Sequence, residues 1–144
     1  MADLVRILET VCNTNSIEFH YGNKSHLNLI DSNSDLCPDK IHLLLFPLRR
    51  GNAINSSRVY NGNFFYVKPD NFAQEYFNET DGDNCESKYD TCIEPLITSL
   101  DLLEQKLKWC EGIDIVSWES IDAIDVLDAN MSGLWVTFQF RVYE

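Results

Sequence analysis

Hydrophobic positions along the chain predict two amphipathic helices, the first of them at the N-terminus. Its apolar side chains share one stripe over about three turns, which buries one side of a helix and leaves the other in water. Asp3 stands at the start, where a carboxylate favours the positive end of the helix dipole, and the polar run Asn13–Ser16 ends the helix. The stripe consists of Leu4, Val5, Leu8, Val11 and Cys12.

The second helix is longer and ends before Gly112. Apolar residues recur every three or four positions over residues 93–107, as they do on the buried side of a helix. Asp90 or Thr91 can cap its first turn. Pro95 fits within that turn, because the first amides of a helix have no intrahelical acceptor.

Shorter patterns predict strands in the first half of the chain. Ile17–Tyr21 alternates between apolar and polar residues and predicts a short strand. Ile41–Phe46 is almost continuously apolar, which is typical of a central strand covered on both faces. His42 interrupts this run and is expected to be half-buried. Pro47 ends the strand, because proline has no amide hydrogen to donate to a neighbour.

The middle of the chain holds a basic segment and two β-rich runs. Leu48–Asn52 is expected to form a turn, and it carries two adjacent arginines in an acidic chain. Val59–Tyr60 and Phe64–Val67 have the composition of strands. Asn61–Gly62 between them is either a hairpin turn or a bulge in one longer strand.

The C-terminal segment predicts two further strands. Ile113–Asp128 has a shifting alternation, which indicates a strand with a bulge near Glu119 and Ser120, and Asn130–Gly133 is the expected turn. The final strand alternates most regularly, so its two faces differ. One face carries Leu134, Val136, Phe138, Phe140 and Val142, and the other carries Trp135, Thr137, Gln139, Arg141 and Tyr143.

The order of these elements predicts an α+β fold, in which an N-terminal helix and a long helix before the last two strands cover a mainly antiparallel sheet. Residues 28–39 are expected to form a loop, and residues 75–90 an acidic surface insert. No repeat or Pro/Gly linker divides the sequence, so residues 1–144 are expected to form a single domain.

Composition narrows the class of protein. Hydrophobic residues make up 44% of the chain, which excludes a disordered tail, and no apolar run is long enough to span a membrane. The N-terminus has no signal-peptide pattern, and the five cysteines without a CxxC pair are expected as free thiols in a reducing compartment. A net charge of -12 argues against a nucleic-acid-binding surface, yet it is compatible with a channel through which DNA slides.

Motifs for nucleotide binding and hydrolysis are absent from the sequence, including GxxxxGK[ST], GxGxxG, GxSxG and HExxH. His20, His26 and His42 are scattered, and Cys37 beside His42 supplies only two ligands, so we expect no metal. Asp81–Asn84 has the wrong spacing for an EF-hand calcium loop. No cofactor is expected.

A cluster of carboxylates can be considered as a glycosidase-like pair. With 23 acidic residues, such clusters arise from number alone, and no aromatic cleft accompanies this one. We therefore expect that the protein is not an enzyme. The carboxylates are Glu119, Asp122, Asp125 and Asp128.

Two groups of residues favour association with other proteins. The second face of the final strand holds Trp, Tyr and Arg, the residue types enriched at interface cores. If a helix covers that face, the same residues belong to the domain core instead. The other group consists of arginines that either pair with acidic patches of a neighbouring subunit or form a solvated basic turn. The candidate interface residues are Arg49, Arg50, Arg58, Trp135, Gln139, Arg141 and Tyr143.

Four segments carry a resemblance to a known family. They are Phe46–Gly51, Gly62–Val67, Ile93–Leu96 and Val126–Gly133. In these segments and in its element order, the chain resembles small neck or ring proteins of crAss-like and related Bacteroides phages. More distantly it resembles the tail-terminator and tail-completion fold.

The resemblance implies a structural virion protein without enzymatic activity, made in the host bacterial cytoplasm and located in the neck or tail. It would form a homo-oligomeric ring, six- or twelvefold, that joins portal and tail and contacts other neck or tail proteins. Genome DNA would pass through the lumen without specific binding, and no membrane would be involved. The alternative from charge alone is a small cytoplasmic adaptor or immunity-type protein that binds one partner through its acidic surface.

Overall fold

The structure is a computed structural model that describes residues 3–22, 40–69, 89–126 and 131–143. The predicted α+β class is confirmed, with one helix at the N-terminus and one before the last two strands. The elements are α1 (Leu4–Thr14), β1 (Glu18–Tyr21), β2 (His42–Leu45), β3 (Arg49–Arg50), β4 (Ser57–Pro69), the π-helical turn η1 (Tyr89–Ile93), α3 (Glu94–Lys108), β5 (Ile113–Val126) and β6 (Met131–Tyr143).

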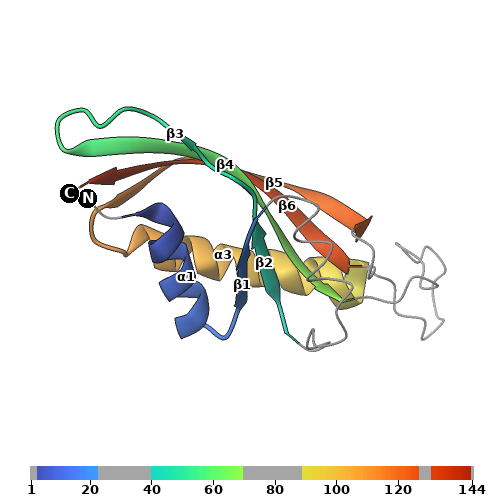
Figure 1. The fold of residues 1–144 in the computed structure, drawn as a ribbon. Coiled ribbons are helices and arrows are strands. Elements are labelled where there is room, and N and C mark those ends of the chain that lie inside the picture. Colours follow the sequence, from blue (N-terminus) through green and yellow to red (C-terminus); the bar gives the residue numbers. More distant parts are fainter. Residues whose placement is uncertain (1–2, 23–39, 70–88, 127–130, 144) are drawn as a thin grey trace, which may run out of the picture.

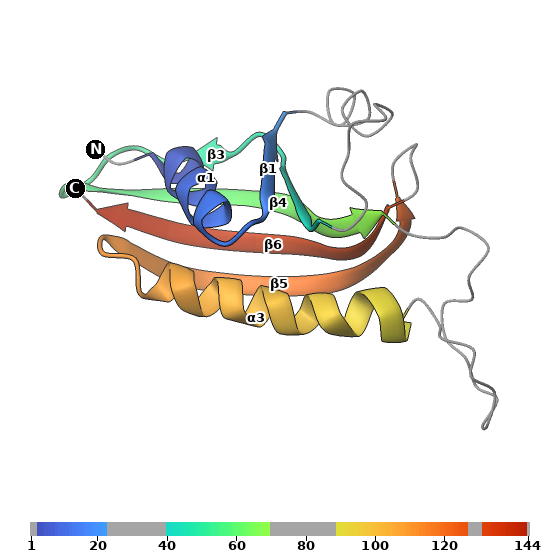
Figure 2. The same cartoon turned by 90° about the horizontal axis from the view of Figure 1, so that it is seen from below.

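The strands form one mixed, mostly antiparallel sheet in the order β1-β2-β4-β6-β5, with β3 paired to β4. Among the strands that the structure describes, only β1 and β2 run parallel to each other. Figure 1 shows α1 and α3 beneath the same face of this sheet. Seen from below in Figure 2, α3 runs along β5 and α1 lies over β4. We call the helix-covered face the inner face and the opposite one the outer face.

The N-terminal helix forms as its sequence predicts. Asp3 caps it, because its side chain accepts a hydrogen bond from the amide of Val5 at 3.0 Å. Leu4, Leu8 and Cys12 are buried against the inner face of the sheet. The predicted stripe of the second helix also reaches this core through Leu96, Leu100, Leu103 and Leu107.

Large aromatic side chains fill the core between the helices and the sheet. Phe138 and Phe140 of β6 stack with ring centroids 4.8 Å apart, and Phe64 of β4 lies 5.7 Å from Phe138. The predicted alternation of the last strand is confirmed, since Leu134, Val136, Phe138, Phe140 and Val142 are all buried.

Two predictions for β2 had different outcomes. Coverage on both faces is confirmed, because all four residues of this interior strand are buried. The half-buried position expected for His42 is wrong, because this side chain is 0% exposed. The free thiols expected from the sequence are confirmed for Cys12, Cys92 and Cys110.

The middle segments are more regular than their sequence indicates. Arg49 and Arg50 do not form a turn but a short strand that pairs with Asn61 and Tyr60. Asn61–Gly62 is neither a hairpin turn nor a bulge, because β4 pairs with β6 in one unbroken register. Glycine suits this crowded position, because a Cβ at Gly62 would lie 2.5 Å from Cδ2 of Leu48, whose side chain would have to shift.

The predicted irregularities of the last hairpin are displaced. Glu119 and Ser120 pair regularly with β6, and the register shifts fall between Ile115 and Ser117 and between Ala123 and Val126. The expected turn Asn130–Gly133 is wrong from residue 131 onward, because β6 begins at Met131. Residues 127–130 lie outside the described residues.

The start of the long helix also differs from its prediction. Neither Asp90 nor Thr91 caps it, because η1 precedes it and Ile93 occupies the N-cap position without a side-chain cap. Pro95 lies in the first turn, as predicted. The loop over residues 28–39 and the acidic insert up to residue 88 lie outside the described residues.

Burial within the core changes the acidity of two side chains. It raises the pKa of the Cys12 thiol from 9.0 to about 12. It also raises the pKa of Tyr66 from 10.0 to about 12, although the hydrogen bond between its hydroxyl and Ser99 Oγ, at 2.6 Å, acts in the opposite direction. Both groups are therefore held in their neutral form.

These shifts predict a loss of stability in alkaline solution. The stabilisation of the fold that comes from the neutral Cys12 thiol is fully present below pH 9, the ordinary pKa of a thiol. It is lost as the pH rises towards 12. The free energy of unfolding should fall by up to about 1.4 kcal/mol per pH unit for each neutral group. Urea unfolding at several pH values measures this slope. Cys12→Ala should make it shallower, and an unchanged slope in that variant would contradict the assignment.

Candidate interaction surface

The outer face of β6 carries the residues that the sequence proposes for an interface. Arg141 and Tyr143 are exposed, and Trp135 and Gln139 are half-buried. Neither described helix covers them, because α1 and α3 both lie on the inner face (Figure 1). Among the described elements, the alternative in which a helix buries these residues in the domain core is wrong.

Trp135 nevertheless has a packing role on this face. Its ring centroid lies 4.5 Å from that of Phe65 and 5.3 Å from that of Phe46. Both phenylalanines also pack against a second buried cluster, which consists of Leu44, Val67 and Met131. Trp135 therefore stabilises the sheet itself and is less available to a partner than its sequence position indicates.

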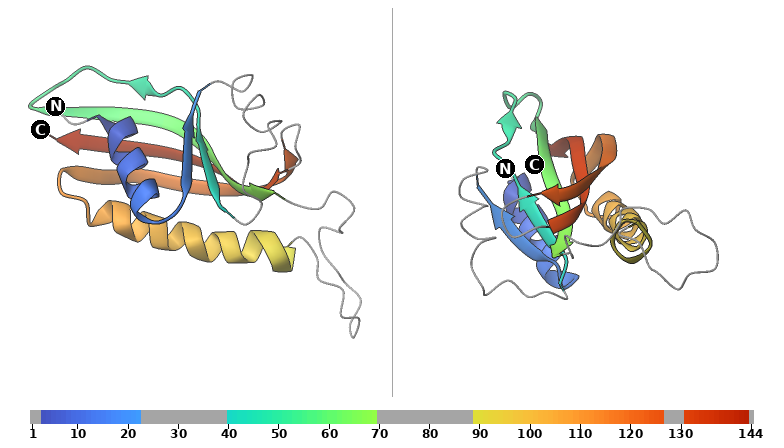
Figure 3. Two further views of the ribbon diagram at one scale, coloured as in Figure 1. Left: turned by 60° about the horizontal axis from the view of Figure 1, so that its bottom comes forward. Right: turned by 90° about the vertical axis from the view of Figure 1, so that its right-hand side faces the viewer.

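The sheet gathers four arginines from three strands at one end, which we call the arginine end: Arg49, Arg50, Arg58 and Arg141. This is the end where β4 and β5 begin and β6 finishes (Figure 3). Arg50 and Arg49 lie opposite Tyr60 and Asn61, and Arg141 lies opposite Val59 on the other side of the same strand. Residues separated by up to 92 positions thus meet at one end of the sheet, with Arg49 and Arg141 on its outer face and Arg50 and Arg58 on its inner face.

The four arginines differ in their internal contacts. Arg50 is engaged within the chain, since its NH2 lies 4.0 Å from Asp3 Oδ1 and its guanidinium lies 5.8 Å from the centre of the Tyr60 ring. The Nε of Arg58 is buried and has no hydrogen-bond partner among the described residues. Arg49 and Arg141 are exposed, and neither forms an ion pair within the described part of the chain. These two are best placed to contact a partner.

Exposed apolar residues adjoin the arginine end, and the sequence patterns did not single them out. Trp109, directly after α3, is 80% exposed, and Ile54, before β4, is 65% exposed. The exposure of Trp109 could have been predicted from the sequence, because this residue does not continue the apolar stripe of the helix, which ends at Leu107. Exposed Trp together with Arg and Tyr is the composition of interface hot spots.

The carboxylates of β5 lie on the edge strand next to β6. Glu119 and Asp122 are exposed on this strand, and we call them the acidic edge. Asp114 lies at the arginine end instead, opposite Arg141, and its Oδ2 accepts a hydrogen bond from the Tyr143 hydroxyl at 2.8 Å. Glu119 and Asp122 lie on opposite faces of the sheet. Glu119 pairs with Thr137, which faces outward, and Asp122 pairs with Leu134, which faces inward. The arrangement is not that of a paired catalytic site. The Asp125 side chain and Asp128 lie outside the described residues.

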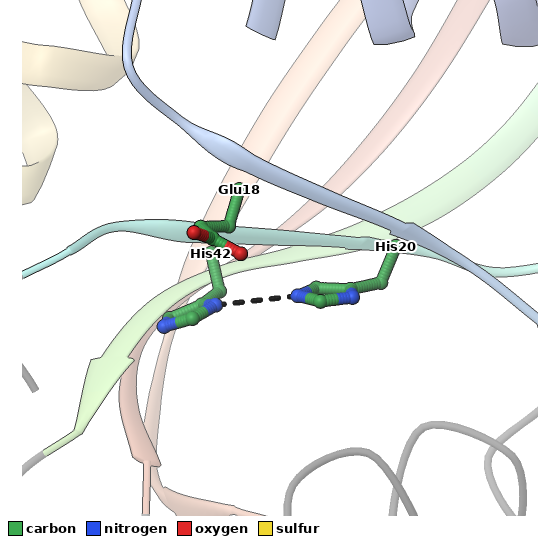
Figure 4. Close-up of side chains that lie close together, drawn as sticks. All are labelled: Glu18, His20 and His42. Carbon is green, nitrogen blue, oxygen red and sulfur yellow. Dashed lines mark hydrogen bonds between the residues drawn. The ribbon is translucent and has the colours of Figure 1, made fainter. Parts of the chain in front are cut away.

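The structure brings together two histidines that are scattered in the sequence. His20 and His42 lie side by side on β1 and β2, with Glu18 beside them (Figure 4). The parallel pairing of these strands creates the cluster, and local sequence patterns carry no signal for that pairing. His26, Cys37 and Asp81–Asn84 lie outside the described residues.

Comparison with protein-family models and with curated proteins finds no match to this chain. No helix in the described ranges combines the length and the apolar character that a membrane span requires.

Proposed function

We propose that this chain is a structural subunit of a homo-oligomeric neck or tail-completion ring that joins the portal and the tail of a tailed phage. The proposal assigns it no enzymatic activity and places it in the virion. The resemblance of four sequence segments supports the family. The position of exposed Arg49 and Arg141 at one end of the sheet, with exposed Glu119 and Asp122 further along its β5 edge, supports the mode of assembly, and it is the observation that carries the proposal.

This arrangement of charges favours contact between unlike surfaces. The exposed Arg49 and Arg141 lie at the arginine end, whereas Glu119 and Asp122 lie along the acidic edge. Opposite charges attract, so the arginine end of one copy is expected to meet the acidic edge of the next. Such a head-to-tail contact generates a ring if its rotation closes, and a filament if it does not.

The remaining features of the arginine end fit a protein contact. Trp109 and Ile54 supply apolar area beside the charges, and desolvated aromatic anchors carry much of the energy of interfaces. The outer face near Trp135 and Gln139 is continuous with this end through β6. The portal and neighbouring neck or tail proteins would contact the ring above and below, and DNA would pass through an acidic lumen without binding.

Negative-stain electron microscopy of the purified chain over a range of concentrations tests the proposal. Closed rings of uniform diameter are expected, either alone or after addition of the portal protein. A protein that stays monomeric at all concentrations and does not bind portal or tail proteins would contradict it. Salt-sensitive one-to-one binding to a basic protein, without rings, would favour the adaptor function instead.

A further inference from the structure

We propose that Glu18, His20 and His42 form a binding site for a zinc ion on the outer face of the sheet. The site joins β1, the edge strand, to β2 beside it. It does not depend on the ring proposal, because it lies away from both the arginine end and the acidic edge.

Strand register places the three side chains together. Glu18 and His20 are two residues apart on β1, so both point to the same face. In the parallel pairing, Glu18 is the partner of His42, and His20 is the partner of Leu44, two positions further along β2. Figure 4 shows the two imidazoles pointing toward each other, with the carboxylate of Glu18 beside His42.

The two histidine nitrogens have the spacing of a zinc site. Nε2 of His20 and Nδ1 of His42 are 3.3 Å apart, and the ligand atoms of all three residues lie within 4.8 Å of one another. Zinc binds imidazole nitrogen at about 2.0–2.1 Å in a tetrahedral arrangement, which sets two such nitrogens about 3.3–3.4 Å apart. The two nitrogens thus already have the required separation.

Small side-chain rotations complete the site. The terminal torsions of His and Glu are broad, so each ring can turn its lone pair toward one ion and the carboxylate can move in from its present distance. Without the ion, the imidazoles form a hydrogen bond in which one ring N–H donates to the other nitrogen. Zinc would replace that proton between the two nitrogens.

The donor set decides which ion is favoured. Two imidazoles and one carboxylate suit zinc and similar late transition metals, whereas calcium and magnesium prefer oxygen donors alone. Lys40 competes with the zinc ion for the Glu18 carboxylate, since its Nζ lies 3.3 Å from Glu18 Oε1. Its side chain is half exposed and can stay paired with one carboxylate oxygen while the other binds the ion.

Isothermal titration of zinc into the full chain, after dialysis against a chelator, tests the site. One zinc ion per chain is expected. His20→Gln and Glu18→Gln should each weaken binding at least about 100-fold, since loss of even an outer-shell partner costs 10–100-fold. Lys40→Gln keeps all three ligands, removes the competing cation, and should bind at least as tightly as the wild type.

Two controls establish that a folded protein binds the ion and that no cysteine does so. Circular dichroism of each zinc-free variant verifies that it is folded, and the half-buried His20 is chosen because the fully buried His42 is riskier to replace. A cobalt-substituted sample should lack a thiolate charge-transfer band, because no cysteine belongs to the site. Absence of zinc binding by the wild type, equal affinity in His20→Gln, or a thiolate band would overturn the proposal.

Discussion

Gly133→Ala is expected to destabilise the fold by about 3 kcal/mol or more, the largest effect we predict for a single methyl group. A Cβ at this position would collide with the carbonyl oxygen of Tyr66, and it would lie 2.8 Å from the Cα of Val67 and 2.9 Å from Cδ1 of Leu96. Two of these neighbours are backbone atoms of β4, held by its continuous pairing with β6. They cannot move away without breaking that pairing. Urea unfolding measures the loss.

Gly51→Ala is the matched control for this substitution. Its added Cβ would lie 3.4 Å from the nearest atom, the carbonyl oxygen of Val59, which is an ordinary contact at an exposed position. We expect a change within about 0.5 kcal/mol, as for most surface substitutions. Equal effects of the two substitutions would show that β4 and β6 do not approach each other as described.

Arg49→Glu and Arg141→Glu are each expected to raise the concentration required for self-association at least about tenfold, which corresponds to about 1.4 kcal/mol. Each replaces an attraction to the acidic edge of the next copy by a repulsion. Sedimentation velocity measures the shift. The association of the wild type should also weaken as the ionic strength rises from about 0.1 M to about 1 M, because the screening length falls from about 10 Å to about 3 Å.

Lys40→Glu is the control for the change in net charge. It makes the same reversal at an exposed lysine before β2, outside the arginine end. If all three variants weakened association equally, overall repulsion between acidic chains would explain the effect. The proposed contact would then be wrong.

Local patterns predicted the elements of this fold better than their pairing. The leucines of α3 recur at the spacing of one helix face, and the apolar residues of β6 alternate as on one face of a strand. Each pattern follows from burial of that one face, and both predictions were confirmed. Asn61–Gly62 has turn composition but lies within β4, because β6 pairs along its full length and Leu48 fills the space beside Gly62. The displaced bulges of β5 likewise depend on its partner strand.

The candidate sites also depend on strand pairing, which local sequence patterns do not predict. Arg49, Arg58 and Arg141 are ordinary surface residues in the sequence and meet at one end of the sheet only when β3, β4 and β6 pair. His20 and His42 meet only because β1 runs parallel to β2, although β2 pairs with β4 in the antiparallel sense. Pairing of distant strands depends on the whole chain, so neither cluster could be predicted from spacing.

Cross-linking of the assembled protein tests the head-to-tail contact most directly. Arg49→Lys introduces an amine at the arginine end, which a carbodiimide joins to a carboxylate in direct contact. In a mixture of isotope-labelled and unlabelled chains, mass spectrometry separates links between chains from links within one chain. Links between chains are expected from position 49 to Glu119 or Asp122 of β5. Links confined to single chains, or links between chains that avoid β5, would contradict it.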